Sequence, residues 1–406
     1  MFIIQKEESF LQTTGIIAEY NPFHNGHLYQ AERAREETDA DVVIAMMSGP
    51  FLQRGEPALT DPWTRAQMAL RGVDVVIQLP YRYATGIAST FAEGGVSLLA
   101  HLGVTTLSFG SEHGEASSFL QAARQITDES NEAVDRTFNE TFAHNFSAHH
   151  AIEAIDITEP NNNLGFHYAR ANERLREPLT LHTVSRKGAA YEETTIHGAI
   201  ASATAIRQTL KKDGLSNDVR RAIPESTALA LQQFNEQATF GSWETFYPYL
   251  RLLLLRATPE QIASIYTVRE GIEHRLLRAA ERAGTFEQFM ASVKTKRYTW
   301  TSIQRMLTHV LTNTTYEMID ASDEPLVAHL LAANERGRRW IQQSKKQFSI
   351  PLLSTLAQSK QRTRSLDDRA IAIYTHLTNS YFGSQTVFRG RAQPPHFSSF
   401  GGSFSK

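Results

Sequence analysis

The sequence of 406 residues contains no cysteine. Disulfide bonds, thiolate nucleophiles and cysteine-ligated zinc or iron–sulfur sites are therefore excluded. No apolar run approaches the ~20 residues that cross a bilayer, so a transmembrane protein is excluded and no membrane partner is expected. The first twelve residues, MFIIQKEESFLQ, lack a basic region followed by a long apolar stretch, so no secretory signal is predicted. We expect a cytoplasmic protein.

Net charge is also nearly absent: 41 Lys and Arg against 43 Asp and Glu give −2. The distribution is uneven, however. The segment 294–364 contains twelve basic and five acidic residues, a net +7, which leaves −9 for the rest of the chain. A near-neutral protein with one basic region is a candidate for binding a polyanion.

The first half of the chain alternates short apolar runs with helix-forming segments. Strands are predicted at 14–19, 41–47, 73–79, 104–109 and 179–184, with helices between them. Buried strands that alternate with helices indicate a parallel sheet covered on both faces. We therefore expect an α/β, Rossmann-like nucleotide-binding domain over residues 1–213, with a helical insertion at about 115–155.

Beyond residue 213 the sequence changes to long amphipathic helices, which predicts an all-α domain over residues 214–390. One of these predicted helices covers residues 324–343. The tail, residues 391–406, is rich in Pro, Gly and Ser and is expected to be disordered.

The sharpest local pattern is EYNPFHNGH, directly after the first predicted strand. Ligands of open α/β sheets bind at the carboxyl ends of the strands. A loop there that leads into a helix offers free backbone N–H groups to phosphate, and Gly26 permits close approach. His24 and His27 can donate hydrogen bonds to phosphate oxygens. A divalent-metal pair or two structural histidines are the alternatives at this point.

A second pattern, ASATAIR, follows the last predicted strand. The hydroxyls of Ser202 and Thr204, with Arg207 one helical turn later, suit a helix N-terminus that binds the β- and γ-phosphates of a nucleotide. Taken alone, Ser202 could be a helix cap and Arg207 a surface charge. Its position at the end of the α/β part favours the phosphate-binding interpretation.

HxGH after the first strand and SxTxxR after the last resemble the HIGH-type nucleotidyltransferase superfamily, in which the two motifs close over ATP. The strings GIIAEYNPFHNGHL, MSGPFLQRGEPA, FGSEHG, EPNNNLGFHY, IASATAIR and KTKRYTWTSIQRM together resemble the tRNA(Met) cytidine acetate ligase family, from about residue 15 to 368. That resemblance implies catalytic roles for His24, His27, Ser202, Thr204 and Arg207. It implies ATP contacts by Ile17, Ala18, Glu19, Tyr20, Asn21, Pro22, Phe23, His24, Asn25, Gly26, His27, Leu28, Tyr29, Gln30, Gly110, Asn161, Asn162 and Arg186, with the choice among Asn161, Asn162 and Asn163 left open.

The activity implied by the resemblance is that of an ATP-dependent ligase. Acetate would be activated as acetyl-adenylate and transferred to N4 of the wobble cytidine of elongator tRNA(Met), with release of AMP and pyrophosphate. Mg²⁺ would accompany ATP, but no carboxylate cluster indicates a metal held by the protein. Three alternatives stay open: a small-molecule adenylyltransferase, a non-catalytic RNA-binding protein with a relic nucleotide site and, weakest, a metallohydrolase.

The segment KTKRYTW within the basic region interleaves cations with aromatics. Lys and Arg contacts to phosphate, combined with base stacking, are a common way to bind RNA. A solvated helix–turn with core aromatics is the alternative. A second candidate patch is RGRRW, residues 336–340, and Arg54 could face the cleft or pair with Glu56. The predicted RNA-binding residues are Lys294, Lys296, Arg297, Tyr298, Trp300 and Arg305.

Overall fold

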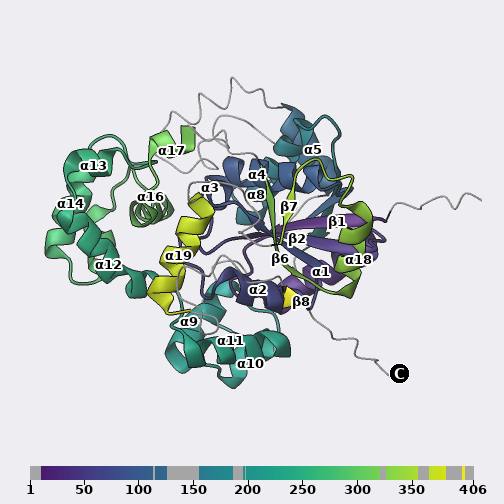
Figure 1. Ribbon diagram of the computed structural model, residues 1–406, viewed down its shortest axis with the longest axis horizontal. Coiled ribbons are helices and arrows are strands. Elements are labelled where there is room, and N and C mark those ends of the chain that lie inside the picture. Colours follow the sequence, from purple (N-terminus) through teal and green to yellow (C-terminus); the bar gives the residue numbers. More distant parts are fainter. Residues whose placement is uncertain are drawn as a thin grey trace, which may run out of the picture.

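The structure is a computed structural model that describes residues 11–112, 115–125, 155–185, 195–196, 198–320, 326–354, 365–380 and 396–397. At its centre lies a twisted sheet with helices on both faces, and a group of helices stands at one end (Figure 1). The predicted fold class, a Rossmann-like parallel sheet followed by a mainly helical region, is confirmed. Of the predicted insertion, residues 126–154 lie outside the described residues.

The sheet follows from five short apolar segments of the first half of the chain. Their order across the sheet is β5-β4-β1-β2-β3, and every pairing among them is parallel. This order reverses direction between β1 and β4, which is the point where doubly wound sheets bind ligands. The bounds are β1 Thr13–Ala18, β2 Val42–Ser48, β3 Val75–Leu79, β4 Thr106–Ser111 and β5 Thr180–Ser185.

Alternate residues of these strands enter two separate hydrophobic cores, as the two-residue period of a strand requires. Ile17, Ile44 and Ile77 pack with the helices of one face, and Ile16 and Val43 with those of the other. The first face is covered by α4 Ala88–His101, α5 Ala116–Gln125 and α8 Pro160–Glu173. The second is covered by α1 Asn25–Glu37 and α2 Pro62–Ala69.

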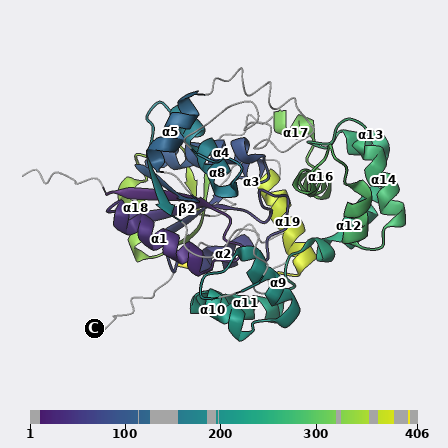
Figure 2. The same ribbon diagram turned by 180° about the vertical axis from the view of Figure 1, so that it is seen from behind.

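The helical lobe has a core of its own and packs against a short helix of the α/β part, α3 Tyr81–Ala84. Phe51 and Tyr81 of the α/β part are buried in that core, so the two parts share apolar packing. Figure 2 shows the lobe from behind, beside the α/β part. Apart from α18 Glu335–Ser344, the described helices that follow β5 in the chain are α9 Ala203–Asp213, α10 Asn217–Ala222, α11 Glu225–Gln237, α12 Trp243–Arg256, α13 Pro259–Ala263, α14 Ile272–Arg282, α15 Phe286–Val293, α16 Trp300–Thr312, α17 Tyr316–Asp320 and α19 Leu366–Thr378.

The prediction of one helix over residues 324–343 is wrong for the first half of that segment. Residues Ala328–Ala333 form β6, which pairs antiparallel with β3, and only then does α18 begin, at Glu335–Ser344. Asn334 caps α18 by accepting the Gly337 N–H at 3.0 Å, which separates the two elements. Strand β7, Leu352–Leu353, extends the sheet, and β8, His396–Phe397, pairs with β6 inside the tail that was predicted to be disordered. The later part of the chain is therefore not helical throughout.

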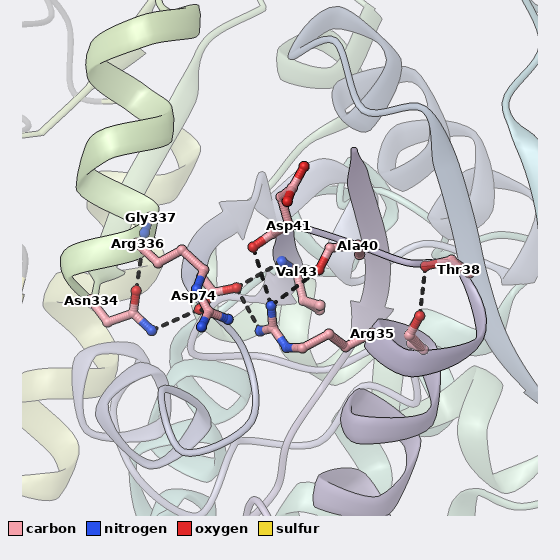
Figure 3. Close-up of polar contacts among 10 residues, drawn as sticks. Arg35, Thr38, Ala40, Asp41, Val43, Asp74, Asn334, Arg336 and Gly337 are labelled. Carbon is pink, nitrogen blue, oxygen red and sulfur yellow. Dashed lines mark hydrogen bonds and ion pairs between the residues drawn. The ribbon is translucent and has the colours of Figure 1, made fainter. Parts of the chain in front are cut away.

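Asp74, at the start of β3, fixes these returning elements to the sheet (Figure 3). Its Oδ2 accepts hydrogen bonds from Arg35 at 2.6 Å and from the Val43 N–H at 2.9 Å. Its Oδ1 accepts from Asn334 at 2.9 Å and lies 3.8 Å from the Arg336 guanidinium. A buried carboxylate is tolerated when its oxygens are satisfied in this way.

The basic region of the sequence is consequently divided in space. Helix α16 belongs to the helical lobe, whereas α18 packs against the sheet at the opposite end of the molecule (Figures 1 and 2). Trp340 is buried in the sheet's core, and Arg336 pairs with Asp74. The two candidate patches of the +7 segment therefore lie apart, and residues 336–340 do not adjoin those of 294–305.

Candidate active site

A cavity of about 710 Å³ opens at the carboxyl ends of β1, β4 and β5. Ile17 and Ala18 of β1, Gly110 of β4, and Val184 and Ser185 of β5 contribute to its wall. The cavity thus lies at the point where the strand order reverses, as expected for an open α/β sheet. Its size suits a nucleotide-sized ligand.

The two histidines of HxGH lie against each other at the start of α1. Their rings stack with centroids 3.7 Å apart and an interplanar angle of 24°. Nδ1 of His24 accepts the Gly26 N–H at 3.0 Å, and Nδ1 of His27 accepts the His24 N–H at 3.4 Å. A neutral imidazole whose Nδ1 accepts carries its proton on Nε2, so both rings are set as Nε2–H donors.

Local packing explains the remaining residues of this loop. A Cβ on Gly26 would lie 2.9 Å from the His24 ring, so glycine is required where that ring packs on the backbone. Asn25 donates from its amide to the carbonyls of Ala199 and Arg221, each at 2.8 Å. Asn25 therefore connects the start of α1 to the segments on either side of α9.

The second motif reaches the same cavity from α9. Ser202 is the N-cap, and its Oγ accepts the Ala205 N–H at 3.0 Å. Arg207 donates to the Asn21 carbonyl at 2.9 Å and to the Thr204 hydroxyl at 3.4 Å. The structure therefore brings together the five residues predicted as catalytic, since His24, His27, Ser202, Thr204 and Arg207 all line the cavity.

Of the predicted ATP contacts, most line the cavity and a few do not. The lining residues are Ile17, Ala18, Glu19, Tyr20, Asn21, His24, Gly26, His27, Tyr29, Gln30, Gly110 and Asn161, whereas Pro22, Phe23, Asn25, Leu28 and Asn162 are not among them. Phe23 is fully buried in the core instead. Arg186 lies outside the described residues.

The asparagine run of α8 divides between cavity and interior. Asn161 and Asn163 line the cavity. Asn162 is fully buried: its Oδ1 accepts from the Ser111 hydroxyl at 2.9 Å and from the Glu112 N–H at 3.2 Å, and its amide donates to the Asp156 carbonyl at 3.0 Å. Asn162 therefore ties α8 to the end of β4.

The loop after β2 joins the cavity to the helical lobe. Gly55 adopts a φ of +73°, and a Cβ there would lie 2.2 Å from the backbone of Arg305. The Gly55 carbonyl accepts from Trp243 and from Thr308, each at 3.0 Å. Arg54 of this loop lines the cavity, so the cleft-facing interpretation of that residue holds.

Apart from Arg305, the predicted RNA-binding residues fall into two groups. Lys294 and Lys296 are exposed, and Trp300 keeps 38% of its surface accessible. Arg297 pairs with Glu270, and Tyr298 donates to the Arg269 carbonyl at 3.0 Å.

Arg305 differs from the rest of this set, because it lines the nucleotide-sized cavity and donates to the Gln53 carbonyl at 3.3 Å. Burial and the neighbouring Arg54 lower its pKa to about 10, so it stays charged at neutral pH. Its charge therefore acts inside the cavity and not on the outer surface.

The sequence patterns did not indicate His167, which lies in the site, or Arg65, which supports the loop after β1. Arg65 on α2 is fully buried and donates to four backbone carbonyls, among them that of Glu19. His167 on α8 lines the cavity, and burial together with Arg170 lowers its pKa to about 3, so the ring is neutral. Only the string GFHY, within the family resemblance, carried a signal for His167.

Within the described ranges, no group of three or more His, Asp or Glu side chains could hold a metal ion. Mg²⁺ that accompanies ATP stays a prediction. The same ranges contain no helix long and apolar enough to cross a membrane.

Known proteins are similar to this chain over most of its length. The family model described as HIGH Nucleotidyl Transferase matches residues 11–387. The tRNA(Met) cytidine acetate ligase of Lysinibacillus sphaericus is 36% identical over 401 residues, covering 95% of this chain and 99% of the relative. That of Bacillus subtilis is 37% identical over 386 residues, covering 90% and 92%.

A solved structure agrees over the same extent. The crystal structure of Thermotoga maritima TmcAL bound with alpha-thio ATP superposes with a TM-score of 0.84 at 28% identity, covering 95% of this chain and 99% of that one. Fold and site thus define a HIGH-type nucleotidyltransferase. Within that class the chain belongs to the tRNA(Met) cytidine acetate ligase family, a family of enzymes.

Proposed function

We propose that the protein activates acetate with ATP and transfers the acetyl group to N4 of the wobble cytidine of elongator tRNA(Met). A carboxylate oxygen of acetate would attack the α-phosphorus of ATP, giving acetyl-adenylate and pyrophosphate. The cytidine amine would then attack the acyl carbon and release AMP. Since the chain has no cysteine, acyl transfer cannot pass through an enzyme thioester, and an adenylate is the natural activated form.

The observation that carries this proposal is the convergence of the two motifs on one cavity. In the first step, negative charge builds on the α-phosphoryl oxygens and on the leaving pyrophosphate. Preoriented N–H donors stabilise such charge because they need no reorganisation during the reaction. His24 and His27 would act on the α-phosphoryl group and the leaving group, while Ser202, Thr204 and Arg207 would hold the β- and γ-phosphates.

A reaction with ATP, labelled acetate and tRNA, followed by nucleoside mass spectrometry, tests the proposal. The expected products are N4-acetylcytidine in tRNA(Met), AMP and pyrophosphate. Active nucleotide cleavage with another acceptor and no acetylcytidine would favour a small-molecule adenylyltransferase instead. Binding of tRNA with no ATP cleavage would favour a non-catalytic RNA-binding protein.

The exposed lysines ahead of α16 are proposed to hold tRNA phosphates. Reversing the charge with Lys296→Glu is expected to raise the KM for tRNA about tenfold at low salt and to flatten its salt dependence, with the KM for ATP unchanged. Lys346→Glu is the matched control, since Lys346 is equally exposed but belongs to the other part of the basic region. Equal effects of the two substitutions on tRNA would contradict this docking face.

A further inference from the structure

Glu19, the first residue after β1, is fixed where the sheet meets the helical lobe. Its backbone carbonyl accepts a hydrogen bond from Arg65 at 2.6 Å, and its Oε1 accepts the Gln53 N–H at 2.8 Å. Gln53 is held in turn by Arg305 of α16, which donates to the Gln53 carbonyl at 3.3 Å. The Glu19 carboxylate is therefore positioned from both parts of the molecule.

The cavity wall around Glu19 combines two sets of residues. It contains the candidate phosphate-binding residues, His24 and Arg207 among them, and also Thr301 and Arg305 of α16. Helix α16 directly follows the lysines proposed to bind tRNA. A nucleotide base delivered past those lysines would enter the cavity on the α16 side and meet the Glu19 carboxylate.

The carboxylate keeps capacity for a further partner. Across the ranges that the structure describes, it accepts one hydrogen bond, at Oε1, and no basic side chain lies within ion-pair distance of it. Burial and the nearby Glu56 raise its pKa, against the opposing effects of the Gln53 N–H and of two guanidinium groups. The charged or titratable groups around it are Arg54, Glu56, Arg65, Tyr168 and Arg207.

The second half-reaction requires a proton acceptor. As N4 of cytidine forms its bond to the acyl carbon, the C–O bond to AMP breaks and the nitrogen must lose one of its two protons. AMP leaves with the bonding electron pair on its phosphate, and the proton goes to the base that lies closest to N4. A carboxylate is the side chain that accepts a hydrogen bond from cytosine N4, and a positioned carboxylate can also remove its proton.

We propose that Glu19 is a catalytic residue of acetyl transfer: its carboxylate accepts the N4–H of the target cytosine and takes the proton as the amide forms. The proton then passes to solvent. This inference rests on the proposed function and assigns Glu19 to the acceptor base, whereas the family resemblance counts it among the ATP contacts.

The test separates the two half-reactions in Glu19→Gln, which keeps the shape of the side chain but cannot take a proton. Adenylate formation is measured as acetate-dependent exchange of labelled pyrophosphate into ATP. Acetyl transfer is measured in a single turnover from preformed acetyl-adenylate to tRNA. We expect transfer to slow by about 10²–10⁴-fold and exchange to fall far less. The rise of the wild-type transfer rate with pH, as the carboxyl loses its proton, should disappear in Glu19→Gln.

Two further variants complete the test. Glu19→Asp retains a proton acceptor and should recover part of the transfer rate, whereas a residue needed only for shape would not be rescued by a shorter side chain. Glu56→Gln removes the other carboxylate of the cavity wall. In this variant the transfer rate should still rise with pH as it does in the wild type. Equal losses in exchange and transfer, or an unchanged pH profile in Glu19→Gln, would overturn the assignment. Absence of acetate-dependent exchange in the wild-type enzyme would instead overturn the proposed function, and the assignment with it.

Discussion

Replacing His27 with asparagine is expected to slow acetate-dependent formation of AMP by about 10²–10³-fold, the usual cost of removing one preoriented donor to a developing negative charge. Asparagine can still accept the His24 N–H that Nδ1 of His27 accepts in the structure. It has no group at the position of Nε2, so the substitution removes the phosphate donor while keeping the start of α1. The loss should appear mainly in kcat, because the donor acts on charge that builds in the transition state.

The matched variants sharpen this expectation. Glutamine at position 27 places an amide N–H close to where Nε2–H lies, so His27→Gln should recover part of the rate. His274→Asn, on the exposed face of α14, should leave it unchanged. Pyrophosphate exchange measures the affected step directly. If the rate of pyrophosphate exchange in His27→Asn lay within about threefold of the wild-type rate, the proposed role of the histidines in stabilising the transition state would be contradicted.

The two motifs can be recognised in the sequence because both are local. HxGH and SxTxxR are each carried by a strand end and the first turn of the following helix, so their residue types and spacing already contain the chemistry. Their meeting in one cavity also follows from topology, since parallel strands end at one edge of the sheet. The structure confirms that convergence for His24 and Arg207.

The features that the sequence does not reveal are those that depend on distant partners. The Leu- and Ala-rich segment 328–333 has good helix formers, yet it forms β6 because β3 offers an unpaired edge and all residues of the run except His329 are buried. Likewise, Arg305 is predicted as an RNA contact, and its place in the cavity wall has no sign in the local sequence. It lies in the cavity wall because Gly55 allows the loop after β2 to approach α16 closely. Neither pairing leaves a pattern in the local sequence.

The role of Arg65 also depends on distant partners, and replacing Arg65 is expected to have a large effect on stability. Its guanidinium donates to the carbonyls of Thr60, Glu19, Ser48 and Gly49, and thereby ties the ends of β1 and β2 to α2. Burial lowers its pKa to about 10, which still leaves it charged at neutral pH. In the sequence Arg65 is one arginine within a predicted helix, and no local pattern indicates the carbonyls to which it donates.

Arg65→Met is expected to reduce the free energy of unfolding by about 3–5 kcal/mol, because it leaves several buried carbonyls without a donor. Arg65→Lys should also destabilise, since a single ammonium cannot reproduce the fork of the guanidinium. Urea denaturation followed by circular dichroism measures both. The folded fraction should bind ATP more weakly, because the Glu19–Asn21 loop loses its anchor.

Arg71→Met is the control for this substitution, because Arg71 lies just after the same helix but is exposed. It should change stability by no more than about 0.5 kcal/mol. The anchoring role would be contradicted if the free energy of unfolding of Arg65→Met lay within about 1 kcal/mol of the wild-type value. That difference is roughly the net contribution of one hydrogen bond. If stability fell but ATP affinity of the folded protein did not, Arg65 would support the fold without positioning the loop that leads into the two histidines.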